Sequence, residues 1–273
     1  MNGQLDHHLR RYRAAAGTDA AEVHRGDIEI AGWPVFTRWI HGPRARRWPE
    51  HAHDGAELIW DVTGTVAVRT GTSIWIVPPS LGLWLPAGAR HEILAGAGTA
   101  FACTWVSRGE TAVVDRWPAP ALVTVGTIAR EALRELGEPG LPRPVHDRLV
   151  AVAFDFVTDA AGPGRLPLPT DRRALVVAQA LVDDPADDRH LADWARLAHA
   201  SVRTLSRLFV HQTGLTFAAW RSELRLRHSL ALLADGHPIA TVAERVGYDS
   251  TSAFSAAFRR SLGRSPGAFA QSR

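Results

Sequence analysis

Two helix-turn-helix patterns follow one another in the last third of the chain, and they constrain the fold more than any other feature. The first covers residues 191–209 and the second covers residues 239–260. In each pattern, a short segment with apolar residues at i, i+3/4 and i+7 precedes a tight break, and the next segment starts at a serine. The polar face of such a second helix fits a DNA major groove. The pattern therefore predicts an all-α DNA-binding module.

Local signals support these helices. Ser201 and Ser250 stand where a helix N-cap is expected, because a serine oxygen accepts a hydrogen bond from an unpaired N–H of the first turn. Gly214 and Gly236 stand where helices are expected to end, and Gly247 supplies a turn that tolerates a positive φ. We therefore expect four helices in two units, each with a serine-capped second helix.

The polar faces of the two second helices differ in chemistry. The first is predicted to present Arg203, Thr204, Ser206 and Arg207. The second is predicted to present Thr251, Ser252, Ser255, Ala256 and Arg259. Arginine makes bidentate contacts to guanine or reaches phosphate, whereas small hydroxyls and methyl groups make fewer and weaker contacts. We expect the first unit to dominate DNA recognition.

The region 171–273 resembles the DNA-binding domain of the AraC/XylS family of transcription regulators. Its later part matches the family signature at many fixed spacings, namely Ile239, Ala240, Val242, Ala243, Val246, Gly247, Tyr248, Ser250, Ser252, Phe254, Ser255, Ala257, Phe258, Arg259, Arg260, Gly263, Ser265 and Pro266. The resemblance implies a linking helix over residues 217–234, which holds both units on one face of DNA. It also implies base contacts at six positions: Arg203, Ser206, Arg207, Thr251, Ser252 and Ala256. Family members often carry arginine at the place of Ala256.

Charge is divided unevenly along the chain. Residues 189–273 hold 12 arginines and 5 acidic residues, a net +7, whereas the rest of the chain holds 19 basic and 23 acidic residues, a net −4. A basic segment attached to an acidic one is the electrostatic pattern of a DNA-binding module joined to a domain with another role.

The N-terminal region has a different character. After a start predicted to be flexible, residues 1–26, short β-rich runs alternate with Gly and Pro turns at 35–40, 56–62, 65–70, 73–77, 83–85, 91–94 and 101–106. Closely spaced short strands predict a small all-β barrel or sandwich. Helical periodicity follows over 125–136 and 143–158.

A set of potential metal ligands lies within the β region. His51, His53 and Glu57 precede Gly64, and the segment Pro86-x-Gly88-x-x-His91 follows. This arrangement resembles the two motifs of the cupin superfamily, whose metal-binding members use three histidines and a glutamate. The resemblance implies that His51, His53, Glu57 and His91 hold one divalent ion, and imidazole with carboxylate suits Zn, Fe, Ni or Cu. The alternative is an organic ligand bound among the same side chains.

The helices after the β region have two interpretations. Their apolar residues either form a dimer contact that transmits the effector state or cover the barrel. The residues concerned are Leu133, Leu136, Leu149, Val152 and Phe156.

Cys103 is the single cysteine, so the chain has no intramolecular disulfide, which fits a reducing cytoplasm. Neither a secretory signal nor a membrane-spanning run is found, and we expect a cytoplasmic protein without a membrane partner. P-loop, nucleophile-elbow and dinucleotide motifs are missing from the sequence. A metal-dependent cupin enzyme with an accessory DNA-binding domain is the alternative, but it leaves the two helix-turn-helix units without a purpose. We expect a regulator and not an enzyme.

The sequence thus predicts an α+β chain with a cupin-like β-barrel, following helices and a C-terminal all-α domain. The expected boundaries are 27–160 for a sensor and dimerisation domain, 161–170 for a Pro- and Gly-rich linker, and 171–273 for the DNA-binding domain. The expected function is sequence-specific transcription regulation, in which a small molecule or metal ion controls the DNA-binding domain. Expected partners are double-stranded DNA, the effector, a second copy of the chain in a homodimer, and RNA polymerase.

Overall fold

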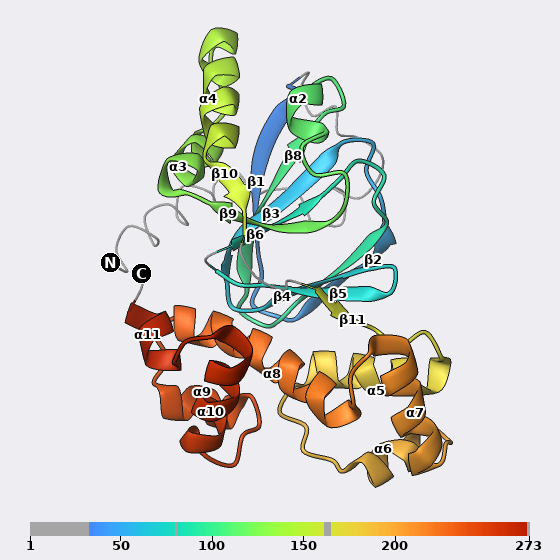
Figure 1. The fold of residues 1–273 in the computed structure, drawn as a ribbon. Coiled ribbons are helices and arrows are strands. Elements are labelled where there is room, and N and C mark those ends of the chain that lie inside the picture. Colours follow the sequence, from blue (N-terminus) through green and yellow to red (C-terminus); the bar gives the residue numbers. More distant parts are fainter. Residues whose placement is uncertain (1–32, 80, 161–164, 272–273) are drawn as a thin grey trace.

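The computed structural model describes residues 33–79, 81–160 and 165–271. The predicted flexible start, residues 1–26, lies outside them. A β domain with attached helices is followed by a group of helices that packs beneath it (Figure 1). The predicted fold class, with a β domain first and a helix-turn-helix domain last, is confirmed.

Two antiparallel sheets form the β domain. The first has the strand order β1-β8-β3-β6-β9-β10, and the second has the order β11-β5-β4-β7-β2. We refer to them as the six-stranded and the five-stranded sheet. The strands are β1 (Val35–His41), β2 (Arg46–His51), β3 (Ala56–Thr63), β4 (Val66–Thr70), β5 (Ser73–Val77), β6 (Leu81–Leu85), β7 (His91–Ala95), β8 (Ala100–Val106), β9 (Ala121–Val125), β10 (Val157–Asp159) and β11 (Arg165–Pro167).

Alternation along the strands separates an inner core from two outer faces. Ile59, Leu83, Ile93 and Phe101 belong to the inner core between the sheets. On the outer face of the six-stranded sheet, Trp60 and its neighbours pack against the helices that follow the barrel. The six-stranded sheet is therefore covered on both faces.

The helices α3 (Thr127–Glu135) and α4 (Arg143–Asp155) cover the six-stranded sheet, and the short helix α2 (Thr111–Val114) precedes them. Leu133 and Leu136 are buried in this layer, and Leu149 packs against it. Val152 and Phe156 remain 40% and 46% exposed. The five predicted contact residues thus divide between the two interpretations: three cover the barrel, and two stay open to a partner.

The remaining helices form the C-terminal domain. They are α5 (Arg172–Asp183), α6 (Leu191–Leu197), α7 (Val202–Thr213), α8 (Phe217–Ala234), α9 (Ile239–Arg245), α10 (Thr251–Leu262) and α11 (Pro266–Gln271). We call α6 and α7 the first unit, α9 and α10 the second unit, and α7 and α10 the reading helices. The helix α8 joins the two units and has the extent that the resemblance implied.

The first unit shares its core with the outer face of the five-stranded sheet. Ile74, Ile76 and Leu166 lie in one apolar cluster with Val177 and Trp220, which we call the shared core. The Trp220 indole N–H donates to the Pro167 carbonyl at 2.6 Å. The DNA-binding domain is therefore packed onto the barrel, as the position of α5 and α8 beneath β11, β5 and β4 also shows (Figure 1).

Two segments differ from their predicted structure. The end of the predicted helix 143–158 is strand β10, because Val157 and Thr158 pair with Val125 and Thr124 of β9. β-branched residues fit a pleated strand better than the last turn of a helix. Within the predicted linker 161–170, residues Arg165–Pro167 form β11 and pair with β5.

Among the described residues, no helix is both long and apolar enough to cross a membrane.

Candidate functional sites

The first unit is built around a sharp turn between α6 and α7. His199 adopts a positive φ of 50°, which is uncommon for a residue with a side chain. The Ser201 hydroxyl then accepts a hydrogen bond from the Thr204 N–H at 3.0 Å. Leu205 and Phe209 are fully buried on the inner side of α7. The cap and the buried stripe fix which face of α7 points outward.

The outer face of α7 carries two arginines. Arg203 and Arg207 are exposed, and neither forms an ion pair with a described residue. Thr204 and Ser206 are half-buried, and the Thr204 hydroxyl lies 2.8 Å from the Ser201 hydroxyl. Nearby arginines of the same domain are paired, for example Arg196 with Asp193. The positive charge of α7 is therefore available to an external anion.

The second unit repeats this construction with different side chains. Gly247 takes the turn at a φ of 79°, and the Ser250 hydroxyl accepts from the Ala253 N–H at 3.1 Å. Phe254 and Phe258 are buried on the inner side of α10. They belong to a second apolar cluster, which we call the separate core. On the outer face, Ser255 is half-buried, and the exposed predicted residues are Thr251, Ser252, Ala256 and Arg259. All nine predicted DNA-contacting residues thus lie on α7 and α10.

The predicted metal ligands meet in the inner core of the barrel. Strands β2 and β7 bring His51 and His91 to directly opposed positions, and Glu57 comes from β3 of the other sheet. One ring nitrogen from each of His51, His53 and His91 lies within 4.8 Å of the others. The Glu57 Oε2 atom is 3.1 Å from His91 Nε2 and 3.4 Å from His53 Nε2. We call these four residues the histidine cluster.

Backbone carbonyls orient two of these histidines. The Nδ1 atoms of His51 and His91 lie 2.7 Å and 2.9 Å from the carbonyls of Pro49 and Ala89. A carbonyl only accepts, so Nδ1 carries the proton and Nε2 carries the lone pair that can bind a metal. Metal-bound histidines are commonly held in this way. The donor set and its orientation fit a divalent transition metal ion.

The charges in the cluster are strongly coupled. Burial alone raises the pKa of the Glu57 carboxyl, but His53 and His91 outweigh it and hold that pKa well below its usual range. Burial lowers the pKa of His91, and the carboxylate of Glu57 more than compensates, so the pKa of His91 is raised. Burial and the neighbouring histidines lower the pKa of His51. The site therefore favours an ionised Glu57 beside a cation.

Sequence reasoning missed one neighbour of this cluster. Cys103 is fully buried, and burial together with Glu57 raises the pKa of its thiol. The strand β8 places it on the inner face, in register with Ile59 of β3. The sequence alone offered only the alternation of β8 as a sign of this position.

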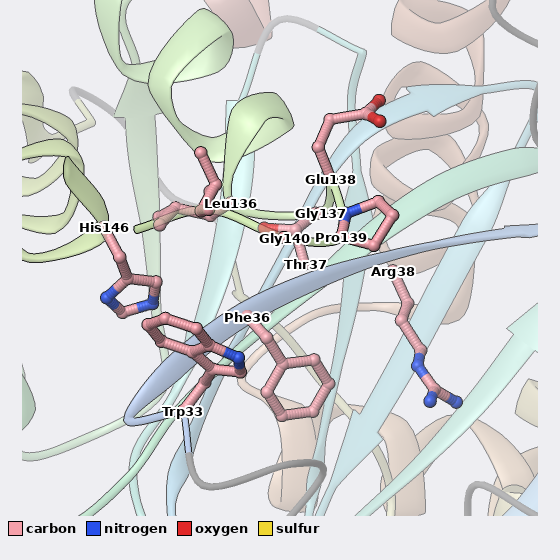
Figure 2. A pocket seen from close by; sticks show the side chains of 11 residues that line it. Trp33, Phe36, Thr37, Arg38, Leu136, Gly137, Glu138, Pro139, Gly140 and His146 are labelled. Carbon is pink, nitrogen blue, oxygen red and sulfur yellow. The ribbon is translucent and has the colours of Figure 1, made fainter. Parts of the chain in front are cut away.

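A cavity of about 400 Å³ lies elsewhere, between β1 and the loop that joins α3 to α4 (Figure 2). Trp33, Phe36 and His146 form one side, while Arg38 and Glu138 lie on the other. The His146 side chain is only 2% exposed, and its Nε2 donates to the Val35 carbonyl at 2.6 Å. The cavity lining does not include the histidine cluster.

Comparisons with known proteins agree with this geometry. A model of the helix-turn-helix domain family matches residues 194–272. The chain is 28% identical over 225 residues to the HTH-type transcriptional regulator NimR of Escherichia coli (strain K12), covering 81% of each chain. It is 43% identical over 103 residues to the HTH-type transcriptional regulator RipA of Corynebacterium glutamicum, which covers 38% of this chain and 31% of RipA.

Two further similarities extend the comparison. The arabinose operon regulatory protein of Escherichia coli (strain K12) is 35% identical over 103 residues, covering 37% of this chain and 35% of that protein. The solved structure of ToxT from Vibrio cholerae aligns with 88% of this chain and 98% of its own, at 12% identity and a TM-score of 0.37.

The two serine-capped reading helices, the matched helix-turn-helix domain and the similarity to NimR, RipA and the arabinose operon regulatory protein define a DNA-binding transcription regulator. Its helix-turn-helix domain, at the C-terminal end, is similar to that of AraC-type regulators.

Proposed function

We propose that this regulator reads DNA through α7 and α10 and is controlled by a divalent metal ion at the histidine cluster. The proposed sensor and DNA-binding domains follow the predicted boundaries 27–160 and 171–273, joined by the β11 segment. One observation supports control: the histidine cluster and the DNA-binding domain occupy opposite faces of the five-stranded sheet.

The strands β2 and β7 carry residues of the histidine cluster on their inner face and charged residues on their outer face. His91 points inward, and Glu92, the next residue of β7, points outward, because successive side chains of a strand alternate. The Glu92 carboxylate is 3% exposed, accepts a hydrogen bond from Arg47 of β2 and forms an ion pair with Arg69 of β4. A displacement of β7 at His91 therefore displaces Glu92 on the other face.

The outer charges extend to the first helix of the DNA-binding domain. Burial raises the pKa of Asp183, at the end of α5; Arg47 lowers it and Glu92 raises it. Beside these charges, Leu94 of β7 packs against the shared core. The ionic and apolar contacts of this face give the effector a physical route to α5 and α8.

The metal ion would be held by His51, His53, Glu57 and His91. When bound, it supplies a positive charge and a fixed set of bonds that restrains β2, β3 and β7 together. A ligand of this kind changes DNA binding only if its affinity differs between the DNA-competent and the DNA-incompetent state.

The DNA-reading part of the proposal assigns the main role to Arg203 and Arg207. Either alanine variant should weaken binding to a selected duplex by about 1–3 kcal/mol. Thr251→Ala and Ser252→Ala should each have a smaller effect. Fluorescence anisotropy with the full-length protein measures the loss. Unchanged affinity and unchanged base preference in both arginine variants would show that α7 does not read DNA.

Zinc serves as the probe for the effector site. Purified protein should bind about one Zn²⁺ per chain, His53→Ala should abolish that binding, and Zn²⁺ should shift DNA affinity about 5- to 150-fold. His41→Ala, which changes an exposed histidine at the end of β1, is the matched control and should bind normally. A melting temperature indifferent to chelator, with no stoichiometric metal, would instead support an organic ligand among the same side chains.

Assembly into a homodimer is part of the same proposal. Val152 and Phe156 leave apolar surface open at the end of α4, and Ile128 of α3 is 50% exposed. Phe156→Ser should shift the sedimentation of the full-length protein toward a monomer. A wild type that is monomeric with and without DNA rules out the dimer contact. RNA polymerase is the further partner proposed for an activating complex on DNA.

A further inference from the structure

The two helix-turn-helix units are joined by one buried guanidinium. Arg225 lies on α8 and is 8% exposed. Its Nε donates to the Pro185 carbonyl at 2.8 Å, and Nη2 donates to the Asp187 carbonyl at 3.0 Å. Its Nη1 donates to the Gly247 carbonyl at 2.6 Å. Pro185 and Asp187 precede the first unit, whereas Gly247 forms the turn of the second.

These carbonyl partners suit a buried cation. Pro185 follows the C-terminal end of α5, and Gly247 follows the C-terminal end of α9, where helix dipoles place negative potential. Burial and the nearby Arg221 lower the pKa of Arg225. The guanidinium keeps its charge nevertheless, because an arginine does not lose its proton in proteins. Its rigid fork binds three carbonyls at fixed angles, which a lysine ammonium does not reproduce.

The turn of the second unit is shaped around this side chain. A Cβ atom added at Gly247 would lie 2.6 Å from Arg225 Nη2 and 2.9 Å from the Ala186 Cα atom. The positive φ of Gly247 also disfavours any other residue. The glycine thus allows the loop before the first unit and the turn of the second to close on the same guanidinium.

The helix α8 packs against both units. Their apolar clusters are distinct, since Phe209 belongs to the shared core and Phe254 to the separate core. A neighbouring link is the bond of 2.9 Å between the Ser222 and Tyr248 hydroxyls.

We propose that Arg225 is a positioning residue that fixes the relative orientation of α7 and α10, and thereby the spacing between the two half-sites that they read. The proposal rests on two-unit DNA reading, but Arg225 itself points into the protein and not toward DNA. One inserted base pair moves a half-site by about 3.4 Å and about a tenth of a turn. A rigid joint should therefore make binding sensitive to each inserted base pair.

The test uses full-length protein and a duplex selected by the wild type, with one or two base pairs inserted or deleted between the half-sites. Wild type should lose about tenfold or more in affinity for each shifted duplex. Arg225→Met and Arg225→Lys should bind the original duplex about tenfold more weakly and the shifted duplexes nearly as well as the original. In these variants, DNA affinity should then depend little on the spacing between the half-sites. Circular dichroism and melting temperature verify that each variant is folded, and the lysine variant keeps the charge if the methionine variant fails to fold.

Arg227→Met is the matched control. Arg227 lies two residues further along α8, is also 8% exposed, and bonds within its own helix to Glu223. It should lose stability but keep the sharp spacing preference. The proposal is overturned if the Arg225 variants lose affinity equally for every spacing, if Arg227→Met flattens the preference as well, or if wild type is indifferent to spacing. A wild type that binds no duplex specifically contradicts two-unit reading itself, and the inference with it.

Discussion

The two helix-turn-helix units have the same backbone plan but different surroundings. The first unit buries Phe209 in a core that it shares with Ile74 and Ile76 of the five-stranded sheet. The second buries Phe258 in a core made by α8, α9, α10 and α11. Near this unit, a 3.4 Å hydrogen bond runs from the Gly64 N–H of the barrel to the carboxylate of Asp235, at the end of α8. The unit that carries Arg203 and Arg207 is thus also the unit that shares a core with the proposed sensor.

This difference indicates that the two units are coupled to the barrel in different ways. A change in the barrel would reach α7 through the packed side chains of the shared core, whereas it would reach α10 only through α8 and its hydrogen bonds. Interfaces with two discrete packings transmit such changes better than exposed loops. We expect an effector to act first on the orientation of the first unit.

The largest effects should come from truncating each core. Phe209→Ala and Phe258→Ala each remove a fully buried ring and should cost about 3–5 kcal/mol of stability. Only Phe209→Ala should also speed hydrogen exchange in β5, because Ile74 and Ile76 share its core. Mass spectrometry of exchanged peptides measures both effects. Equal acceleration in β5 by the two variants would contradict the separation of the cores.

The contrast between the units also marks the limit of sequence reasoning. The helix over 217–234, the serine caps of α7 and α10 and the four cluster residues all followed from local spacing or resemblance. These features depend on residues close together in sequence or on a known motif.

Long-range contacts carried no such signal. The strand β2 was not predicted because its sequence, Arg46–His51, is mostly polar and contains a proline. The strand β11 was not predicted because its sequence lies in a Pro- and Gly-rich stretch. It forms by pairing with β5 at the edge of the five-stranded sheet. The partners of Glu92 and Arg225 come from distant segments, so nothing in the adjacent residues marks their roles.

A pH effect of intermediate size should come from a buried histidine on α8, the helix that joins the two units. His228 on α8 is 8% exposed, and burial lowers its pKa from 6.5 to about 4. Its Nε2 atom has no hydrogen-bond partner among the described residues. It lies one helical turn after Leu224 of the shared core, on the same face of α8. As pH falls below about 6.5, His228 binds a proton in the unfolded chain but stays neutral in the folded chain. The free energy of unfolding therefore decreases until about pH 4.

The expected loss over this range is about 3 kcal/mol, and it is absent at pH 7 and above. His228→Leu should flatten this part of the pH profile in urea unfolding experiments. An unchanged slope in the variant would show that His228 is not the group responsible.

The smallest effect tests the contact that joins the first unit to the barrel. Trp220→Phe removes the N–H that donates to Pro167 and leaves a carbonyl unsatisfied, which should cost about 1 kcal/mol beyond the lost ring volume. Trp194→Phe is the matched control, because Trp194 is equally buried in the shared core but its indole nitrogen has no partner among the described residues. Urea unfolding gives the difference between the two variants, and hydrogen exchange in β11 shows where it acts. Faster exchange in β11 should appear only in Trp220→Phe; if Trp194→Phe has the same effect, the shared core and not this hydrogen bond holds the first unit against the sheet.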